Sequence, residues 1–281
     1  MKYYVLSTLT RVLLEKLRKY HKNDAQLLVF SKDFIGEEVF AFGVYEKHEI
    51  QSVLASLDFD CSHETLLDIG ANIGNHAVQF APHFKQVRCY EPNPLTFKIL
   101  QINTRNLANL ERNNFGLSNR NENAQLTVPT HNVGGAHVSE HSTETGVDIQ
   151  LKVGDEVISD PFAVIKIDVE GHELEALQGL RNSILEYKPL ICFELINTED
   201  NSIALIDYLA SLGYVNYYMP HERGYKGNKR KSFFLTFLNG LFFKRSTKLR
   251  EVTTIDKTFY NLLICEHPES SFRIKETNIK R

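Results

Sequence analysis

Apolar positions in the middle of the chain alternate between two spacings. Short runs typical of strands occur at Thr65–Ile69, Gln86–Tyr90, Ala163–Val169, Leu190–Leu195 and Tyr214–Met219, with a further strand around Phe115. Runs with helical spacing occur at Asn75–Phe84, Leu95–Leu107, Glu173–Leu185 and Ile203–Leu212. Strands that alternate with helices predict an α/β fold, built on a mostly parallel sheet with helices on both faces.

Three regions do not follow this alternation. Residues 1–60 predict an amphipathic N-terminal helix, a hairpin of Leu27–Phe30 with Val39–Phe42, and a helix near Lys47–Leu57. Residues 113–160 are rich in Asn, Ser, Thr and Gly and predict a loop-rich wall of a binding cleft, with strand-like pieces at Gln125–Val128 and Ile149–Val153. We therefore expect an extension (1–60), a central domain (61–220) and a C-terminal extension (221–281) that completes the sheet.

Charge and cysteine usage narrow the class of protein. The 281 residues carry 32 basic and 35 acidic side chains, a net charge of −3, so nothing indicates a nucleic-acid partner. No apolar run is long enough to span a bilayer, and the N-terminus lacks the pattern of a signal peptide. The four cysteines form no CxxC pair, so we expect a reducing, cytoplasmic location and no cysteine-based zinc site.

The C-terminal extension has its own charge pattern. Residues Arg223–Arg250 contain nine basic residues and no acid, and they enclose the aromatic run SFFLTFLNGLFF. Such a segment suits peripheral contact with an anionic membrane or an anionic glycan. The simpler alternative is a strand or helix that packs on the domain.

The most informative motif follows the first predicted strand. In LDIGANIGNH, Asp68 ends a strand and Gly70 and Gly74 permit a tight turn into a helix. The second strand ends at Glu91, whose carboxylate can accept hydrogen bonds from both hydroxyls of an adenosine ribose. A dinucleotide site needs G-x-G-x-x-G, and two of its three glycines are replaced here by Asn72 and Asn75. An acid at Asp68 suits the cationic S-adenosylmethionine and not a pyrophosphate.

These residues, with later motifs, carry a resemblance to a known family. DIGANIGNH, YEPNP, the Gly134–Gly135 pair, IKIDVEGHELEALQGL and KPLICFEL resemble the FkbM family of class I S-adenosylmethionine-dependent methyltransferases, in the same order. The resemblance implies a Rossmann-like fold with a seven-stranded sheet and an O-methyltransferase, often acting on sugars of surface polysaccharides or on natural products. It also implies that Asp68, Gly70, Ala71, Asn72 and Gly74 form the cofactor loop. Glu91 then accepts the ribose, and Asn93 lies near the adenine.

A second constellation lies on the fourth strand of the central domain. Strand alternation places Lys166, Asp168 and Glu170 on one side. A lysine in a buried strand needs an anionic partner, so we predict an ion pair from Lys166 to Asp68 or Glu194.

Removal of the acceptor's proton needs a base close to the reacting hydroxyl. We expect Asp168 or Glu170 to be this base, with His172 as the third candidate. These three residues are the predicted catalytic group. Asp168 has an alternative role as partner of the cofactor's ammonium. His76 lies on the first turn of the helix predicted at Asn75–Phe84, and its side chain faces either the cleft or the solvent.

No metal centre is predicted. Asp168, Glu170 and Glu194 could supply oxygen ligands, but their spacing matches no known cation motif. His131, His137 and His141 include a helical spacing typical of zinc ligands, yet Gly134 and Gly135 argue against a helix there.

The leading hypothesis is an O-methyltransferase that acts on a hydroxyl-bearing acceptor, a sugar of a polysaccharide, glycolipid or natural product. Two alternatives stay open from sequence: an NAD-dependent oxidoreductase on a similar sheet, and a non-catalytic protein that binds the cofactor. The sequence predicts no oligomeric state.

Overall fold

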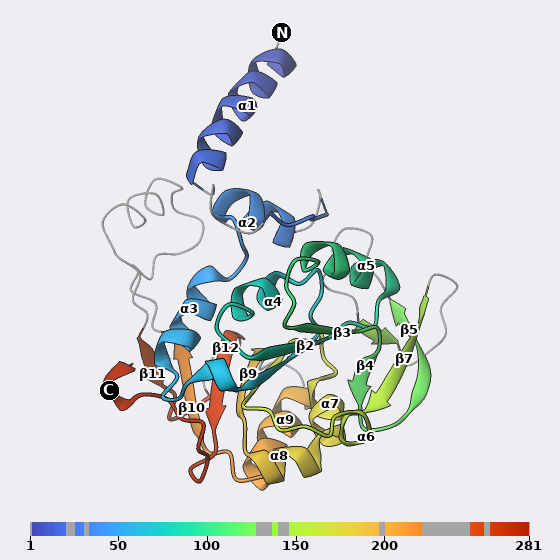
Figure 1. Cartoon of the computed structure of the whole chain (residues 1–281), viewed down its shortest axis with the longest axis vertical. Helices are drawn as coiled ribbons and strands as arrows, with labels where there is room; N and C mark the ends of the chain where they lie inside the picture. The colour runs from blue at the N-terminus through green and yellow to red at the C-terminus, as the bar shows by residue number, and fades with distance from the viewer. Residues whose placement is uncertain are drawn as a thin grey trace.

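The computed structural model describes residues 2–20, 26–30, 34–127, 137–139, 146–196, 200–220, 248–255 and 259–280 (Figure 1). The chain begins with three helices, α1 (Lys2–Tyr20), α2 (Phe34–Phe42) and α3 (Lys47–Ser56). A layered α/β body follows (Figure 1). None of the helices in the described ranges has the length and hydropathy of a membrane-spanning segment.

The body is built on one large sheet. Its strands are β1 (Thr65–Ile69), β2 (Gln86–Tyr90), β3 (Leu110–Asn113), β8 (Val164–Ile167), β9 (Leu190–Ile196), β10 (Asn216–Pro220), β11 (Leu249–Glu251), β12 (Phe259–Glu266) and β13 (Ile279–Lys280). They lie in the order β13-β11-β10-β12-β9-β8-β1-β2-β3. The pairs from β3 to β9 are parallel, while β12 is antiparallel to both β9 and β10. The predicted α/β class and parallel core are confirmed, and β8 lies between β1 and β9 as expected.

Alternate residues of the central strands feed two separate cores. Leu66, Val164 and Cys192 pack with apolar side chains of α3, of α4 (Asn75–Phe80) and of α5 (Pro94–Asn103). Their neighbours Leu67 and Ile165 point the other way, into a core with α7 (Glu173–Gly179), α8 (Arg181–Tyr187) and α9 (Asp200–Ser211). Helices therefore cover both faces, which explains why these strands are apolar without interruption.

A smaller sheet occupies the region between β3 and β8. Its strands β4 (Gly116–Ser118), β5 (Glu122–Thr127), β6 (His137–Ser139) and β7 (Val147–Val153) lie in the order β4-β7-β5-β6. A short helix, α6 (Gly154–Val157), follows β7. The predicted loop-rich wall is thus largely a sheet, with Leu126, Ile149 and Leu151 in its own small core.

Three local expectations were wrong. Residues 34–42 form a helix and not half of a hairpin, because a short apolar run such as Val39–Phe42 fits either structure. Phe115 lies between β3 and β4, outside any strand. The sheet has nine strands among the described residues instead of seven, because β11 and β13 extend its edge beyond β10.

The predicted helix Glu173–Leu185 is divided into α7 and α8 at Leu180. The end of α7 rests on the small sheet, and a Cβ added at Gly179 would lie 1.9 Å from the backbone oxygen of Ser118 in β4. Only glycine permits this approach.

We predict that Gly179→Ala lowers the free energy of unfolding by about 1–3 kcal/mol, because α7 and β4 must separate to admit the methyl group. Urea unfolding followed by circular dichroism measures it. The exposed Asn182→Ala on α8 is the matched control and should change stability little. Equal stability of Gly179→Ala and the parent would contradict the packing described.

Candidate functional site

The turn from β1 into α4 packs closely against the backbone that follows β8. Gly70 has φ +77°, and a Cβ there would lie 1.9 Å from the backbone oxygen of Asp168, which follows β8. Asn72 adopts the left-handed region at φ +50°, a conformation that asparagine tolerates better than most residues. The turn therefore keeps its backbone bare at the edge of the sheet where ligands of open α/β folds bind.

Glu91 lies directly after β2 and is held by this turn. Its Oε2 accepts a hydrogen bond from the backbone N–H of Asn72 (2.9 Å), and its Oε1 accepts one from that of Asn93 (2.8 Å). Burial raises the pKa of Glu91 to about 7, although the two backbone hydrogen bonds favour the ionised form. Each oxygen retains a lone pair, so the carboxylate can still accept two hydroxyl donors.

A pocket opens at the carboxyl ends of β1, β2 and β8, where ligands of open α/β folds bind. Four predicted cofactor residues line it: Gly70, Asn72, Glu91 and Asn93. So do the three predicted catalytic residues Asp168, Glu170 and His172, and the small sheet contributes Gly116, Leu117, Leu126 and Leu151. Asp68, which is buried in β1, and Ala71 and Gly74, which belong to the turn itself, are not among the lining residues.

Thr96 is a lining residue that the sequence did not indicate. Its hydroxyl is buried and finds no hydrogen-bond partner among the described residues. A buried hydroxyl without a partner is costly, and a ligand with a polar edge in this pocket would remove that cost.

The turn after β8 carries the second group of polar residues. The Glu173 Oε1 accepts hydrogen bonds from the backbone N–H groups of Val169 (3.1 Å) and Gly171 (3.2 Å), which fixes the turn. Glu170 is forced to φ +52°, an uncommon conformation for a residue with a side chain. Its carboxyl group stands at the pocket mouth, where the surrounding protein and the nearby Asp168 and Glu173 carboxylates raise its pKa to about 7.

His172 connects this turn to the small sheet. Its Nε2 lies 3.0 Å from the Ser118 Oγ, and its Nδ1 lies 3.7 Å from Glu175. Burial lowers the pKa of His172, so the imidazole is neutral at pH 7. This residue is held by β4 and does not have the free surface position of an ordinary helix-start histidine.

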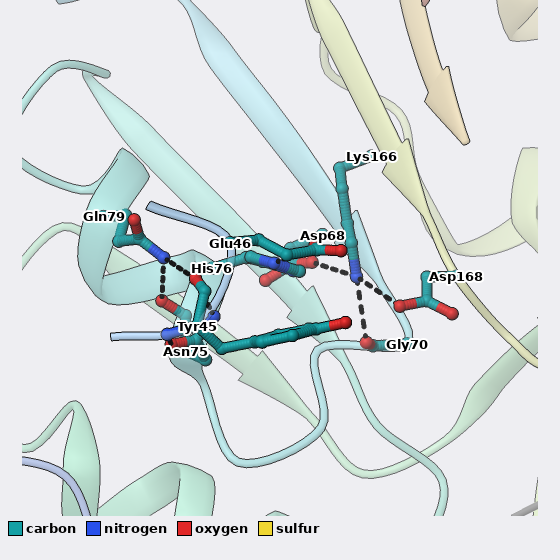
Figure 2. Close-up of polar contacts among 9 residues, drawn as sticks. All are labelled: Tyr45, Glu46, Asp68, Gly70, Asn75, His76, Gln79, Lys166 and Asp168. Carbon is teal, nitrogen blue, oxygen red and sulfur yellow. Dashed lines mark hydrogen bonds and ion pairs between the residues drawn. The ribbon is translucent and has the colours of Figure 1, made fainter. Parts of the chain in front are cut away.

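Lys166 joins the two turns (Figure 2). Its Nζ lies 3.5 Å from Asp68 Oδ1 and 3.6 Å from Asp168 Oδ2, and it donates a hydrogen bond to the Gly70 carbonyl (3.3 Å). Burial alone would lower the pKa of Lys166, but the Asp68, Asp168 and Glu46 carboxylates raise it. The predicted ion pair with Asp68 is confirmed, and Asp168 is an additional partner.

Asp68 depends on this lysine. Both of its carboxylate oxygens are buried, and neither accepts a hydrogen bond from any described residue. Its charge is therefore balanced by Lys166 at 3.5 Å.

The segment between α2 and α3 places Tyr45 and Glu46 near the Lys166 ion pairs, which the sequence did not predict. Tyr45 is fixed to α4 by three hydrogen bonds: its N–H donates to Asn75 Oδ1 (2.9 Å), and its carbonyl accepts from Asn75 Nδ2 (3.0 Å) and Gln79 Nε2 (2.9 Å). Its ring extends across the turn toward Gly70 and the Lys166 ion pairs (Figure 2). Burial, then the Glu46, Glu194 and Asp168 carboxylates, raise the pKa of its hydroxyl.

His76 is buried by the same segment. Its Nε2 lies 3.0 Å from Glu46 Oε2, and its ring packs beside that of Tyr45. Of the two orientations open from sequence, the solvent-facing one is therefore wrong. No local pattern could have paired Glu46 with His76, because the contact depends on how residues 43–46 fold over α4.

Carboxylates dominate the electrostatics beside the pocket. Burial raises the pKa of Glu194 to about 8, and the Asp168, Glu170, Glu46 and Glu173 carboxylates add to the shift. The raised pKa values of Glu194 and Glu170 both reflect this proximity, since a nearby negative charge disfavours ionisation.

Within the described residues, no group of three or more His, Cys, Asp or Glu side chains is arranged to hold a metal ion. Gly134, Gly135, His131, His141 and the His137 side chain, which figured in the sequence motifs, lie outside the described part.

The sequence matches the methyltransferase FkbM domain over residues 68–225, more than half of the chain. The chain belongs to the FkbM methyltransferase domain family. The match favours the methyl donor over the NAD alternative, and S-adenosylmethionine is the cofactor that this family uses.

Two known proteins illustrate the similarity. The hexuronic acid methyltransferase AglP of Haloferax volcanii is 34% identical over 126 residues, which cover 43% of this chain and 52% of AglP. The chain thus aligns with about half the length of this curated relative. The crystal structure of methyltransferase FkbM from Methylobacillus flagellatus KT aligns with a TM-score of 0.50 and 17% identity, covering 90% of this chain and 57% of that chain. This second likeness concerns the fold alone.

The residues present fit the cofactor. Glu91 offers two acceptor oxygens at a buried position, Thr96 offers an unsatisfied hydroxyl, and Gly70 lines the pocket without a side chain.

We predict that Lys166→Met lowers the free energy of unfolding by about 3–5 kcal/mol, because Asp68 is left buried and ionised without a partner. Urea unfolding measures the change. The double variant Asp68→Asn/Lys166→Met should recover much of the loss, since it leaves no isolated buried charge. A single variant as stable as the parent would refute the pairing.

The raised pKa of Glu91 predicts a pH dependence of stability. Between pH 4.5, the ordinary pKa of a glutamate, and about pH 7, the Glu91 carboxyl keeps its proton in the folded protein and has lost it in the unfolded chain. The Glu91 contribution to stability therefore falls as pH rises through that window. Urea unfolding at several pH values should show a slope that is shallower in Glu91→Gln, whereas the exposed Glu186→Gln should keep the parent's slope.

Proposed function

We propose that this protein is an S-adenosylmethionine-dependent O-methyltransferase whose acceptor is a hydroxyl group of a sugar, in a polysaccharide, glycolipid or related natural product. One observation carries the proposal. The buried Glu91 carboxylate and the Gly70 turn share a pocket with the carboxylates of Asp168 and Glu170. A cofactor-binding half and a proton-accepting half thus meet in one cavity.

The cofactor-binding half would be used as follows. S-adenosylmethionine, when bound, supplies a methyl group made electrophilic by a sulfonium. Glu91 would accept hydrogen bonds from the ribose hydroxyls, and Thr96 and Asn93 would lie at the adenine end of the pocket. Asp168, whose side chain is 33% exposed and paired with Lys166, suits the cofactor's ammonium. Asp68 would support the turn through its ion pair with Lys166, and Ala71 and Gly74 would shape the turn itself.

Glu170 is our choice for the base. It stands at the pocket mouth, and its pKa of about 7 lets it hold or release a proton at neutral pH. The acceptor's hydroxyl proton would move to the Glu170 carboxylate as the oxygen forms its new bond to carbon. His172, neutral and held by Ser118, would line the acceptor's approach.

A sugar acceptor is supported by the relative AglP, whose name describes methylation of a hexuronic acid.

We also propose that the central domain is bounded at residues 60 and 220. A further proposal is peripheral contact with a membrane or anionic glycan through Arg223–Arg250. Residues 221–247 lie outside the described part of the chain. Their support is the run of nine basic residues without an acid.

We predict that Glu170→Gln lowers kcat by about 100-fold or more with little change in affinity for S-adenosylhomocysteine, because it removes a base and no cofactor contact. Asp168→Asn should weaken cofactor affinity as well. Calorimetry and release of S-adenosylhomocysteine with a panel of glycans measure the two effects. The parent's kcat should rise with pH up to about 7, and Glu170→Gln should lack that rise.

Asp207→Asn, exposed on α9, is the matched control and should behave as the parent. Failure of the parent to bind S-adenosylhomocysteine would refute the function, whereas binding with an unaffected Glu170→Gln would refute only the assigned base.

A further inference from the structure

Helix α1 carries an apolar stripe that is open to solvent. Val5, Leu6, Leu9, Val12 and Leu13 are between 49% and 64% exposed, and their spacing places them along one side of the helix. The helix packs against α2 and extends away from the body (Figure 1). None of its side chains belongs to the hydrophobic cores formed by the described residues.

The charge of α1 differs in sign from that of the whole chain. Residues 2–20 contain five basic residues and one acid, a net charge of +4, whereas the chain as a whole carries −3. Arg11 lies on the side opposite the stripe, and Lys16 and Lys19 lie toward its C-terminal end. Lysines at such positions can extend along an apolar surface while their ammonium groups stay in water.

The apolar stripe and the positive charge of α1 together indicate which kind of partner could cover the stripe. A second copy of α1 would bring another +4 charge alongside, and the segment Arg223–Arg250 of this chain is itself basic without an acid. Both would be repelled. An anionic lipid surface offers acyl chains for the stripe and negative headgroups for the basic side chains.

We propose that α1 is an interfacial helix that docks the protein on an anionic lipid surface, with Val5, Leu6, Leu9, Val12 and Leu13 inserted among the acyl chains. The helix lies in the plane of the surface and does not cross it. The proposal goes beyond the methyl-transfer function and does not depend on it. Through α2, docking would bring the body of the protein close to acceptors held at a membrane.

Flotation of the full-length protein with vesicles tests the proposal. The parent should float with vesicles of phosphatidylcholine and phosphatidylglycerol in equal parts, and should stay behind with phosphatidylcholine alone. Leu9→Gln/Leu13→Gln should weaken binding by roughly tenfold or more. Neutralising Arg11 or Lys16 to Gln should weaken it by about five-fold each. Ile203→Gln, an equally exposed apolar position on α9, is the matched control and should bind as the parent.

A second measurement reports the orientation of the helix. The chain has no tryptophan, so one introduced at Leu9 or at Ser7 is the only such fluorophore. Two residues apart on a helix, these positions point to nearly opposite sides, with Leu9 at the centre of the stripe. Leu9→Trp should shift its emission to the blue on anionic vesicles, and Ser7→Trp should not.

Several results would overturn the proposal. These are no flotation of the parent, flotation that Leu9→Gln/Leu13→Gln leaves unchanged, and equal emission shifts at the two tryptophan positions. If light scattering showed a dimer that the double variant converts to a monomer, the stripe would belong to a second copy instead. Binding would belong to the basic segment Arg223–Arg250 if two results occurred together. Flotation would be lost when Lys229, Arg230 and Lys231 are neutralised with α1 intact, and it would be unaffected in Leu9→Gln/Leu13→Gln.

Discussion

A single buried ammonium group, that of Lys166, holds the two ligand-facing turns in register. It lies between β1 and β9 at the centre of the parallel sheet, and it contacts the Asp68 carboxylate, the Asp168 carboxylate and the Gly70 carbonyl. A charge at this depth persists only because its counter-charges are equally fixed. Asp68 lies near the end of β1, and Gly70 and Asp168 begin the turns that follow β1 and β8. The same contact that stabilises the sheet therefore sets the distance between the two halves of the pocket.

Much of this arrangement could be predicted from the chain alone, because β1, β2 and the central part of β8 are short apolar runs bounded by polar turns. Asp68, Glu91 and Asp168 stand where strands end, so their common edge follows from parallel pairing. The pairing of Lys166 with Asp68 follows from strand order and alternation. The family match rests on the same residues.

The remainder depends on contacts between distant segments. Tyr45 and Glu46 reach the site only because residues 43–46 bind Asn75 and Gln79, and no periodicity encodes that contact. The apolar run Val39–Phe42 fits a strand as well as a helix, and packing decides in favour of α2. Asp68, predicted to belong to the cofactor loop, is wholly buried as the counter-charge of Lys166, and its contact with the cofactor stays a prediction. The unpartnered hydroxyl of Thr96 also follows from burial, which helical spacing does not reveal.

The position of β12 has a consequence for how the protein is made. This strand, Phe259–Glu266, lies between β9 and β10, which precede it in the chain by many residues. Until the ribosome has released residue 266, the edges of β9 and β10 carry unpaired backbone groups that can join to other chains. The nascent protein must therefore wait for residues 259–266 before its sheet can close, and that interval is when it most needs protection from aggregation.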